Sequence, residues 1–161
     1  MPTDQEIEDK FWRALRNERT VMLGTDGGIM PRPMTAQVAN EENAGPIWFF
    51  TSTDTSLAAA ATGVCEAYFS MMSKGHDVFA SVDGRLSVSH DRAMIDELWN
   101  PFVAAWYEGG KDDPKLVLMR FDADEAEIWL DEWSLIAGLK MLMGSDPKKD
   151  AEGKMAKVTL D

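Results

Sequence analysis

The run Ile47-Trp48-Phe49-Phe50-Thr51, near the middle of the chain, is its strongest strand signal. β-branched and aromatic residues favour strands, and here they place bulky side chains on both faces. Polar residues from Glu41 to Gly45 predict a turn before this strand. Asp54-Thr55-Ser56 can cap a short helix over 57–62 after it, and Gly63 is suited to ending that helix. The centre of the sequence therefore indicates a strand–turn architecture with short helices.

Upstream of this strand, the pattern predicts two further strands and an opening helix. Residues 20–25 form a β-like run followed by the hairpin-type turn Asp26-Gly27-Gly28. Residues 32–40 alternate in polarity, and the prolines at 31 and 33 suit the start or the edge of a strand. Before them, Thr3 and Glu6 have the spacing of a capping box. The apolar residues that follow at helical spacing are Ile7, Phe11, Ala14 and Leu15.

Downstream, the pattern predicts strands over 64–72, 78–89, 116–122 and 127–130, and helices over 91–99 and 135–143. Phe102, Val103 and Trp106 fit a further helical turn, and Gly84 is expected to form a bulge or a hairpin turn. About seven strands joined by short turns favour an antiparallel barrel or sandwich over a doubly wound parallel sheet. We expect a single domain over residues 1–161: a mainly β, closed barrel with flanking helices (α+β) and a polar tail from about 145.

Composition excludes several classes of function. With 28 acidic and 16 basic residues the net charge is −12, which disfavours nucleic-acid binding. No apolar run approaches the roughly 20 residues of a membrane helix, and the first residues lack the pattern of a secretory signal. One cysteine, Cys65, makes the cytoplasm the expected location. Two histidines far from that cysteine give no expectation of a metal site.

The residues do not form a recognisable catalytic motif. His76 and His90 lie outside any nucleophile-elbow pattern, Cys65 is interpreted as a small buried hydrophobe, and the phosphate-binding glycine motifs are missing from the sequence. A pocket for a flat, aromatic, anionic molecule remains, with aromatic walls and a local cation. Arg32, between two prolines at the start of a strand, is the candidate cation, although an ordinary surface arginine is the alternative.

Several segments, taken in order, resemble a known family. They are Arg32-Pro33-Met34, Trp48-Phe49-Phe50-Thr51-Ser52, Trp99-Asn100-Pro101, Gly109-Gly110-Lys111-Asp112-Asp113-Pro114 and the strand over 126–129. The sequence resembles the general stress protein branch of the pyridoxamine 5′-phosphate oxidase-like, FMN-binding split-barrel proteins. The resemblance implies an antiparallel split β-barrel and a homodimer with FMN in a cleft between the subunits. FAD or a deazaflavin is the alternative cofactor.

The resemblance also implies site residues. Arg32, Pro33 and Met34 match the strand that borders the flavin, and Phe50, Thr51 and Ser52 match the strand end beside its ring and ribityl chain. Thr55, Ser56 and Leu57 match the turn that receives the phosphate, where relatives commonly have a basic residue in place of the leucine. Two features could replace that charge: the backbone N–H groups and dipole at the start of the helix over 55–62, or Lys74 or Arg85 from another strand. Trp106 is expected to face the partner's flavin. A flavin-dependent oxidoreductase, a non-catalytic dimeric stress protein without flavin and a deazaflavin-dependent reductase are the functions to separate.

Overall fold

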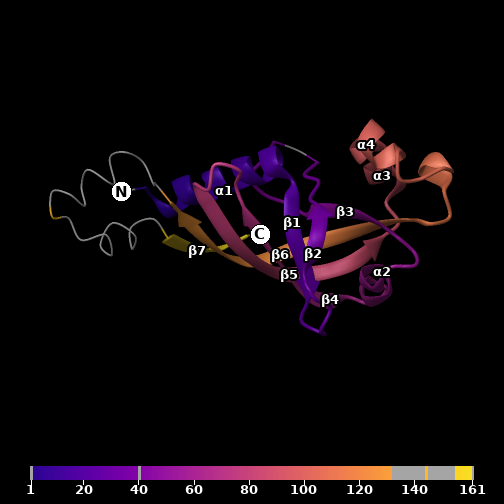
Figure 1. Ribbon diagram of the computed structural model, residues 1–161, viewed down its shortest axis with the longest axis horizontal. Coiled ribbons are helices and arrows are strands. Elements are labelled where there is room, and N and C mark those ends of the chain that lie inside the picture. Colours follow the sequence, from indigo (N-terminus) through magenta and orange to yellow (C-terminus); the bar gives the residue numbers. More distant parts are fainter. Residues whose placement is uncertain (1, 40, 132–143, 145–154, 161) are drawn as a thin grey trace.

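The protein is built on one antiparallel sheet of seven strands (Figure 1). The computed structural model describes residues 2–39, 41–131, 144 and 155–160. The strands are β1 (Thr20–Thr25), β2 (Arg32–Thr35), β3 (Ile47–Ser52), β4 (Cys65–Met72), β5 (Val78–Ser89), β6 (Leu116–Leu130) and β7 (Met155–Thr159). The helices are α1 (Asp4–Glu18), α2 (Ser56–Ala61), α3 (Arg92–Leu98) and α4 (Pro101–Ala104), with a 3-10 turn at Gly110–Asp112. The predicted helix over 135–143 lies outside the described residues.

The sheet curls until its two ends meet without closing. Its strand order is β2-β1-β4-β5-β6-β3, so β2 and β3 are the ends of that path. Just after β2, Gln37 forms a bridge to Trp48 in β3, with backbone N–O distances of 2.7 and 2.8 Å. No ladder between β2 and β3 forms among the described residues. The expected closed barrel is therefore wrong, and the barrel is split beside β2 and β3.

Strand β6 is a single long element that pairs with three other strands. One edge of β6 pairs with β5 along nearly its whole length. The other edge of β6 pairs with β3 over residues 116–121 and with β7 over residues 125–129. The prediction of two strands, over 116–122 and 127–130, missed that the intervening polar residues continue the same ladder. β7 lies in the segment expected to be a polar tail, and Ala156 and Leu160 from this segment are buried.

Gly84 occupies a bulge, the first of the two expected alternatives. The register between β5 and β6 shifts between Asp83 and Gly84. A Cβ atom at Gly84 would lie 2.3 Å from the carbonyl oxygen of Asp122 and 2.8 Å from the ring of Phe121. Glycine is required here because the backbone of β6 approaches too closely for a side chain.

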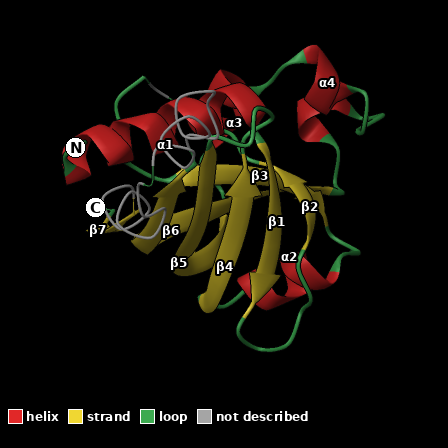
Figure 2. Cartoon of the chain, turned by 60° about the vertical axis from the view of Figure 1, so that its left-hand side comes forward, coloured by secondary structure: helices red, strands yellow, loops and turns green. Residues whose placement is uncertain are grey.

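The helices cover the core on opposite sides of the sheet (Figure 2). α1 begins with the predicted capping box of Thr3 and Glu6 and packs against β5, β6 and β7. Its buried residues are Ile7, Phe11, Trp12 and Leu15. α2 packs against β3, β5 and β6, while α3 contributes Ile95 and Leu98 to a second apolar cluster with Trp48 of β3.

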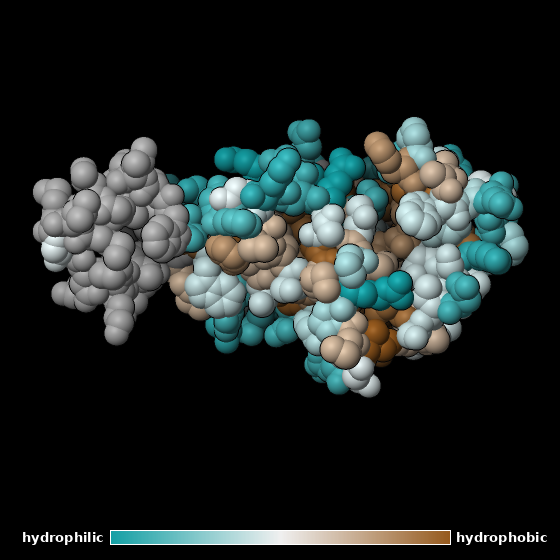
Figure 3. Space-filling model, in the orientation of Figure 1, coloured by the Kyte–Doolittle hydropathy of each residue, from teal (hydrophilic) through white to brown (hydrophobic). Residues whose placement is uncertain are grey.

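One face of the surface is mainly hydrophilic along its upper edge (Figure 3). Figure 3 shows hydrophilic residues over α1 along the upper edge, with apolar residues visible among them toward the middle. In the described part of the chain, no helix is long and apolar enough to cross a membrane.

Candidate functional site

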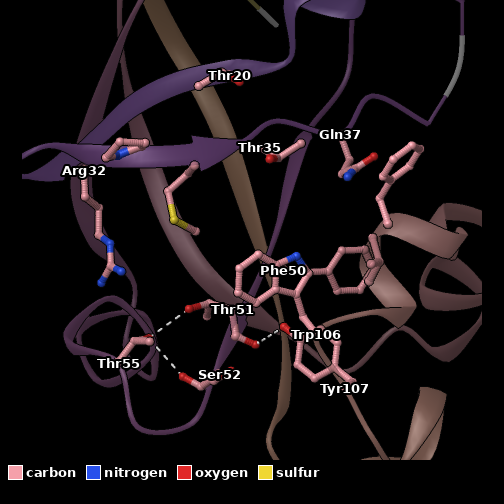
Figure 4. A pocket seen from close by; sticks show the side chains of 14 residues that line it. Thr20, Arg32, Thr35, Gln37, Phe50, Thr51, Ser52, Thr55, Trp106 and Tyr107 are labelled. Atoms are coloured by element: carbon pink, nitrogen blue, oxygen red, sulfur yellow. Dashed lines mark hydrogen bonds between the residues drawn. The ribbon is translucent and has the colours of Figure 1, made fainter.

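A cavity of about 510 Å³ opens beside the split in the barrel. Three elements line it: β2 on one side, the end of β3 together with the start of α2 at its base, and the segment around α4 on the other side (Figure 4). Two of these elements, β2 and β3, are the ends of the sheet. The cavity therefore forms where the sheet fails to close.

Most residues singled out from the sequence meet in this cavity. Those that line it are Arg32, Pro33, Met34, Phe50, Thr51, Ser52, Thr55 and Trp106. Ser56 and Leu57 do not line it: Ser56 is exposed, and Leu57 is fully buried in the core. A helix turns about 100° per residue. Leu57, two positions after the cap residue Thr55, therefore faces the sheet rather than the cavity.

The polar end of the cavity is organised by the cap of α2. The Thr55 hydroxyl donates to the carbonyl oxygen of Ser52 at 2.9 Å and accepts from the backbone N–H of Ala58 at 3.2 Å. Because its one proton is used in this way, the contact of 2.9 Å between the hydroxyls of Thr51 and Thr55 has Thr51 as donor. These bonds fix the two hydroxyl groups at the base of the cavity.

Arg32 brings a positive charge to the same end. Its side chain extends from β2 toward Thr55 (Figure 4), and it makes none of the ion pairs found in the described part of the chain. Arg85, by contrast, pairs with Asp124 at 3.1 Å. Neither Arg85 nor Lys74, which lies in the turn after β4, lines the cavity. Arg32 is thus a guanidinium at the cavity that no carboxylate of the described residues neutralises.

The opposite wall is aromatic and depends on how α4 begins. The Asn100 side chain caps this helix by accepting from the N–H groups of Phe102 and Val103 at 2.9 and 3.0 Å. Residues four apart then share a face. Val103 and Tyr107 are 7% and 5% exposed, whereas Phe102 and Trp106 are 82% and 84% exposed. The cavity therefore has a buried aromatic wall with two exposed aromatic side chains at its rim.

Sequence analysis missed Tyr107, which is the buried member of this wall. Its hydroxyl donates to the carbonyl oxygen of Thr51 at 2.6 Å. Burial is the largest influence and raises the pKa of this hydroxyl; a hydrogen bond with the Ser52 side chain lowers it, and the Asp113 carboxylate raises it again. The net shift is upward, so the hydroxyl remains a donor at neutral pH. The signal was present in the sequence, because the cap at Asn100 places positions 103 and 107 on one face and 102 and 106 on the other.

The loop after Tyr107 is held by one carboxylate. Asp113 accepts from the backbone N–H groups of Gly109 and Lys115, each at 2.9 Å, and these bonds lower the pKa of Asp113. The carbonyl oxygen of Lys115 then accepts from Thr53 N at 3.0 Å, which ties the loop to the end of β3. The Gly-Gly segment thus stabilises the wall from its C-terminal side.

Metal and thiol chemistry find no support near the cavity. Within residues 2–39, 41–131, 144 and 155–160, no group of three or more His, Cys, Asp or Glu side chains could hold a metal ion. Cys65 is half-buried in β4, and burial followed by the charge of Asp26 raises the pKa of its thiol. A raised pKa makes a thiol less reactive at neutral pH.

Comparison with solved structures shows close relatives of this fold. A protein described as a general stress family member from Xanthomonas campestris pv. campestris is 55% identical, with 84% of this chain and 94% of that chain covered and a TM-score of 0.78. The general stress FMN/FAD binding protein from Xanthomonas citri is also 55% identical, with coverages of 81% and 93% and a TM-score of 0.77. A general stress protein 26 homologue from Jannaschia sp. CCS1 is 31% identical, with coverages of 98% and 100% and a TM-score of 0.80.

Sequence comparison agrees with the structural relatives. Protein bli-3 of Neurospora crassa is 26% identical over 131 residues, which covers 74% of this chain and 62% of bli-3. The chain thus spans less than two thirds of the length of that relative. The model of the "pyridoxamine 5′-phosphate oxidase like" family matches residues 6–151. The chain belongs to the pyridoxamine 5′-phosphate oxidase-like family and has its split-barrel fold.

Proposed function

We propose that the cavity between β2, β3 and α4 binds a flavin, specifically FMN, and that the protein is a flavin-dependent oxidoreductase. The observation that carries this proposal is the pairing, within one cavity, of an un-neutralised guanidinium at one end with an aromatic wall at the other. FMN has the matching division between a phosphate and a flat ring system. Cofactor sites commonly combine apolar walls with a few fixed polar groups.

The phosphate would lie at the end that holds Arg32 and the hydroxyl group of Ser52, since the Thr55 hydroxyl is already engaged by Ser52, Ala58 and Thr51. A protein of net charge −12 repels anions in general, so a phosphate needs a local cation. Arg32 provides one without first leaving a carboxylate partner. The guanidinium can donate two parallel hydrogen bonds to phosphate oxygens. Leu57, buried in the core, has no part in this arrangement.

The ring system would lie between β2 and the aromatic wall. Phe50 of β3 lines the cavity, and Pro33 and Met34 of β2 border it. Trp106 at the rim offers a flat apolar face, and aromatic rings stack favourably on such faces. In this position the protein's role is to bind and orient the ring and to exclude water, while a bound flavin supplies the hydride or electron transfer.

A second copy of the chain would complete the site. Phe102 and Trp106 are large apolar side chains that are more than four fifths exposed, and both line the cavity. Tryptophan and phenylalanine are enriched at protein interfaces, where they contribute much of the binding energy. We infer a homodimer in which this rim packs against the partner subunit beside the cofactor.

The relatives support the same assignment. A protein that is 55% identical over most of its length is an FMN/FAD binding protein by name. FMN is favoured over FAD or a deazaflavin because Arg32 is the one cation among the described residues that line the cavity, which suits one phosphate rather than a longer acidic tail. The half-buried free thiol of Cys65 suits a reducing compartment such as the cytoplasm.

The absorbance spectrum of the isolated protein tests the proposal. The protein as purified should show flavin bands, or gain them on titration with FMN, and thermal stability should rise with FMN concentration by mass action. Parallel titrations with FAD, riboflavin and a deazaflavin rank the cofactors. A protein that is colourless and not stabilised by any of the four compounds would refute flavin binding.

A further inference from the structure

One hydrogen bond connects the two walls of the cavity. The buried hydroxyl of Tyr107 donates to the carbonyl oxygen of Thr51, which is 56 positions away in the chain. Thr51 is also the residue whose hydroxyl contacts Thr55 at the polar end. The bond therefore links the segment that carries the exposed Trp106 directly to the base of the site.

Aromatic packing runs alongside this bond. The ring of Tyr107 lies 6.2 Å from that of Trp99, tilted by 39°. Trp99 in turn meets Phe50 edge to face, with the ring centroids 6.2 Å apart. These contacts attach the segment around Tyr107 to β3 through apolar surface, and apolar attraction has no preferred direction. The hydroxyl adds the directional contact that fixes where residue 107, and thus its neighbour Trp106, sits along β3.

Helix α4 needs such an anchor because it has four residues. A helix of this length is not stable by itself, since nucleation is costly and few bonds are formed. The cap at Asn100 stabilises its first turn locally but does not attach the helix to the sheet. Trp106 lies after its last turn, where the backbone bonds from Trp106 N–H to the carbonyl oxygen of Val103, at 3.0 Å, and from Tyr107 N–H to that of Ala104, at 3.2 Å, continue the coil.

We propose that Tyr107 is a positioning residue that tethers the aromatic wall to β3 and so sets the place of Trp106 against the cofactor ring. The inference that the ring is a flavin rests on the proposed function, whereas the tether itself does not. Tyr107 is 5% exposed and its hydroxyl is held by the backbone of Thr51, so its main effect on the cofactor ring is to place Trp106.

The tether is tested in the flavin-free protein by amide hydrogen exchange. Tyr107→Phe removes the hydroxyl and keeps the ring, and Tyr68→Phe, in β4 away from the cavity, is the matched control. The amides of Trp106 and Tyr107 should exchange about 5- to 10-fold faster in Tyr107→Phe. The local opening that exposes these amides then costs less free energy, because it no longer has to break the hydrogen bond of the tyrosine hydroxyl. They should be unchanged in Tyr68→Phe. Unchanged exchange in both variants would overturn the tether. Far-ultraviolet circular dichroism establishes that both variants are folded.

The route through Trp106 is tested by double-mutant cycles with FMN as the ligand. If Tyr107 acts by placing Trp106, then Tyr107→Phe should weaken FMN binding about 5-fold in the parent protein and hardly at all in a Trp106→Ala background. With Arg32→Ala, at the other end, the two effects should multiply. A further signature is the fluorescence of bound flavin, which reports its contact with an indole and should rise in Tyr107→Phe. If the effects of the two substitutions on FMN affinity multiply in both cycles, the proposed route through Trp106 is refuted.

The two proposals fail in different ways. If the unaltered protein binds no FMN, the proposed function is refuted, while the exchange experiment still decides whether Tyr107 holds the wall. If FMN binds normally and Tyr107→Phe alters neither exchange nor affinity, the flavin site stands and the positioning role is refuted.

Discussion

Arg32→Ala should weaken FMN binding far more than it weakens riboflavin binding. Arg32 is exposed at the cavity and makes no ion pair within the described residues, so its removal leaves no unpaired carboxylate behind. The cost is then the contact with phosphate itself. A charge-assisted hydrogen bond contributes about 1.5–3 kcal/mol. One such bond corresponds to roughly a 10- to 150-fold rise in the dissociation constant for FMN. Solvent exposure and screening favour the lower part of this range.

The assay is titration of flavin-free protein with FMN and with riboflavin, followed by flavin absorbance and fluorescence. Riboflavin lacks the phosphate, so Arg32→Ala should change its affinity by less than about 3-fold. Arg13→Ala, in α1 and away from the cavity, is the matched control, since it removes the same charge from the same protein. FMN binding should be nearly unchanged in that control.

Two results would refute the reasoning. If Arg32→Ala binds FMN as tightly as the parent protein, Arg32 does not hold the phosphate. If FMN and riboflavin lose affinity equally, Arg32 contacts the ring or the ribityl chain instead. A steep salt dependence of FMN affinity that disappears in Arg32→Ala would support the assignment independently.

Three further predictions address the fold, the buried tyrosine and the rim. Gly84→Ala should destabilise the protein by about 3 kcal/mol in urea unfolding, because its Cβ would meet the carbonyl oxygen of Asp122 at 2.3 Å; Gly63→Ala, with open space around it, should stay within about 0.5 kcal/mol. Because burial raises the pKa of Tyr107 above 10.0, the unfolded chain loses the hydroxyl proton at a lower pH than the folded protein does. The free energy of unfolding should therefore fall above about pH 10, and this fall should be smaller in Tyr107→Phe. Trp106→Ala should shift the mass measured by light scattering from dimer toward monomer; a monomeric parent protein at micromolar concentration would contradict the homodimer.

Local patterns in the sequence predicted the elements whose causes are local. The capping box at Thr3 and Glu6 and the bulky run at 47–51 each depend on neighbouring residues, and both are confirmed. The continuity of β6 and the existence of β7 depend on pairing between distant segments. The strand was predicted to break between residues 122 and 127, but β5 pairs with it across these residues.

The split in the barrel depends on a balance that composition does not reveal. Pro31 and Pro33 suggested an edge strand, and β2 does lie at one end of the sheet. Whether the two ends pair is decided by their relative twist and spacing in space. The structure joins them by the single bridge of Gln37 and Trp48, which leaves room for the cavity.

The candidate site was predicted mainly through family resemblance. That resemblance identified the β2 and β3 residues, because they are contiguous in the sequence and keep their order. It assigned Ser56 and Leu57 without considering the phase of α2, which turns Leu57 into the core. It also missed Tyr107, whose role depends on a hydrogen bond to a backbone atom far away in the chain.

A crystal structure of the protein grown with excess FMN tests the central claim most directly. Electron density for the ring should fill the cavity between β2, β3 and Trp106, with the phosphate within hydrogen-bond distance of the Arg32 guanidinium. Density for FMN at another place, or a cavity closed by the protein's own side chains at saturating FMN, would contradict the account.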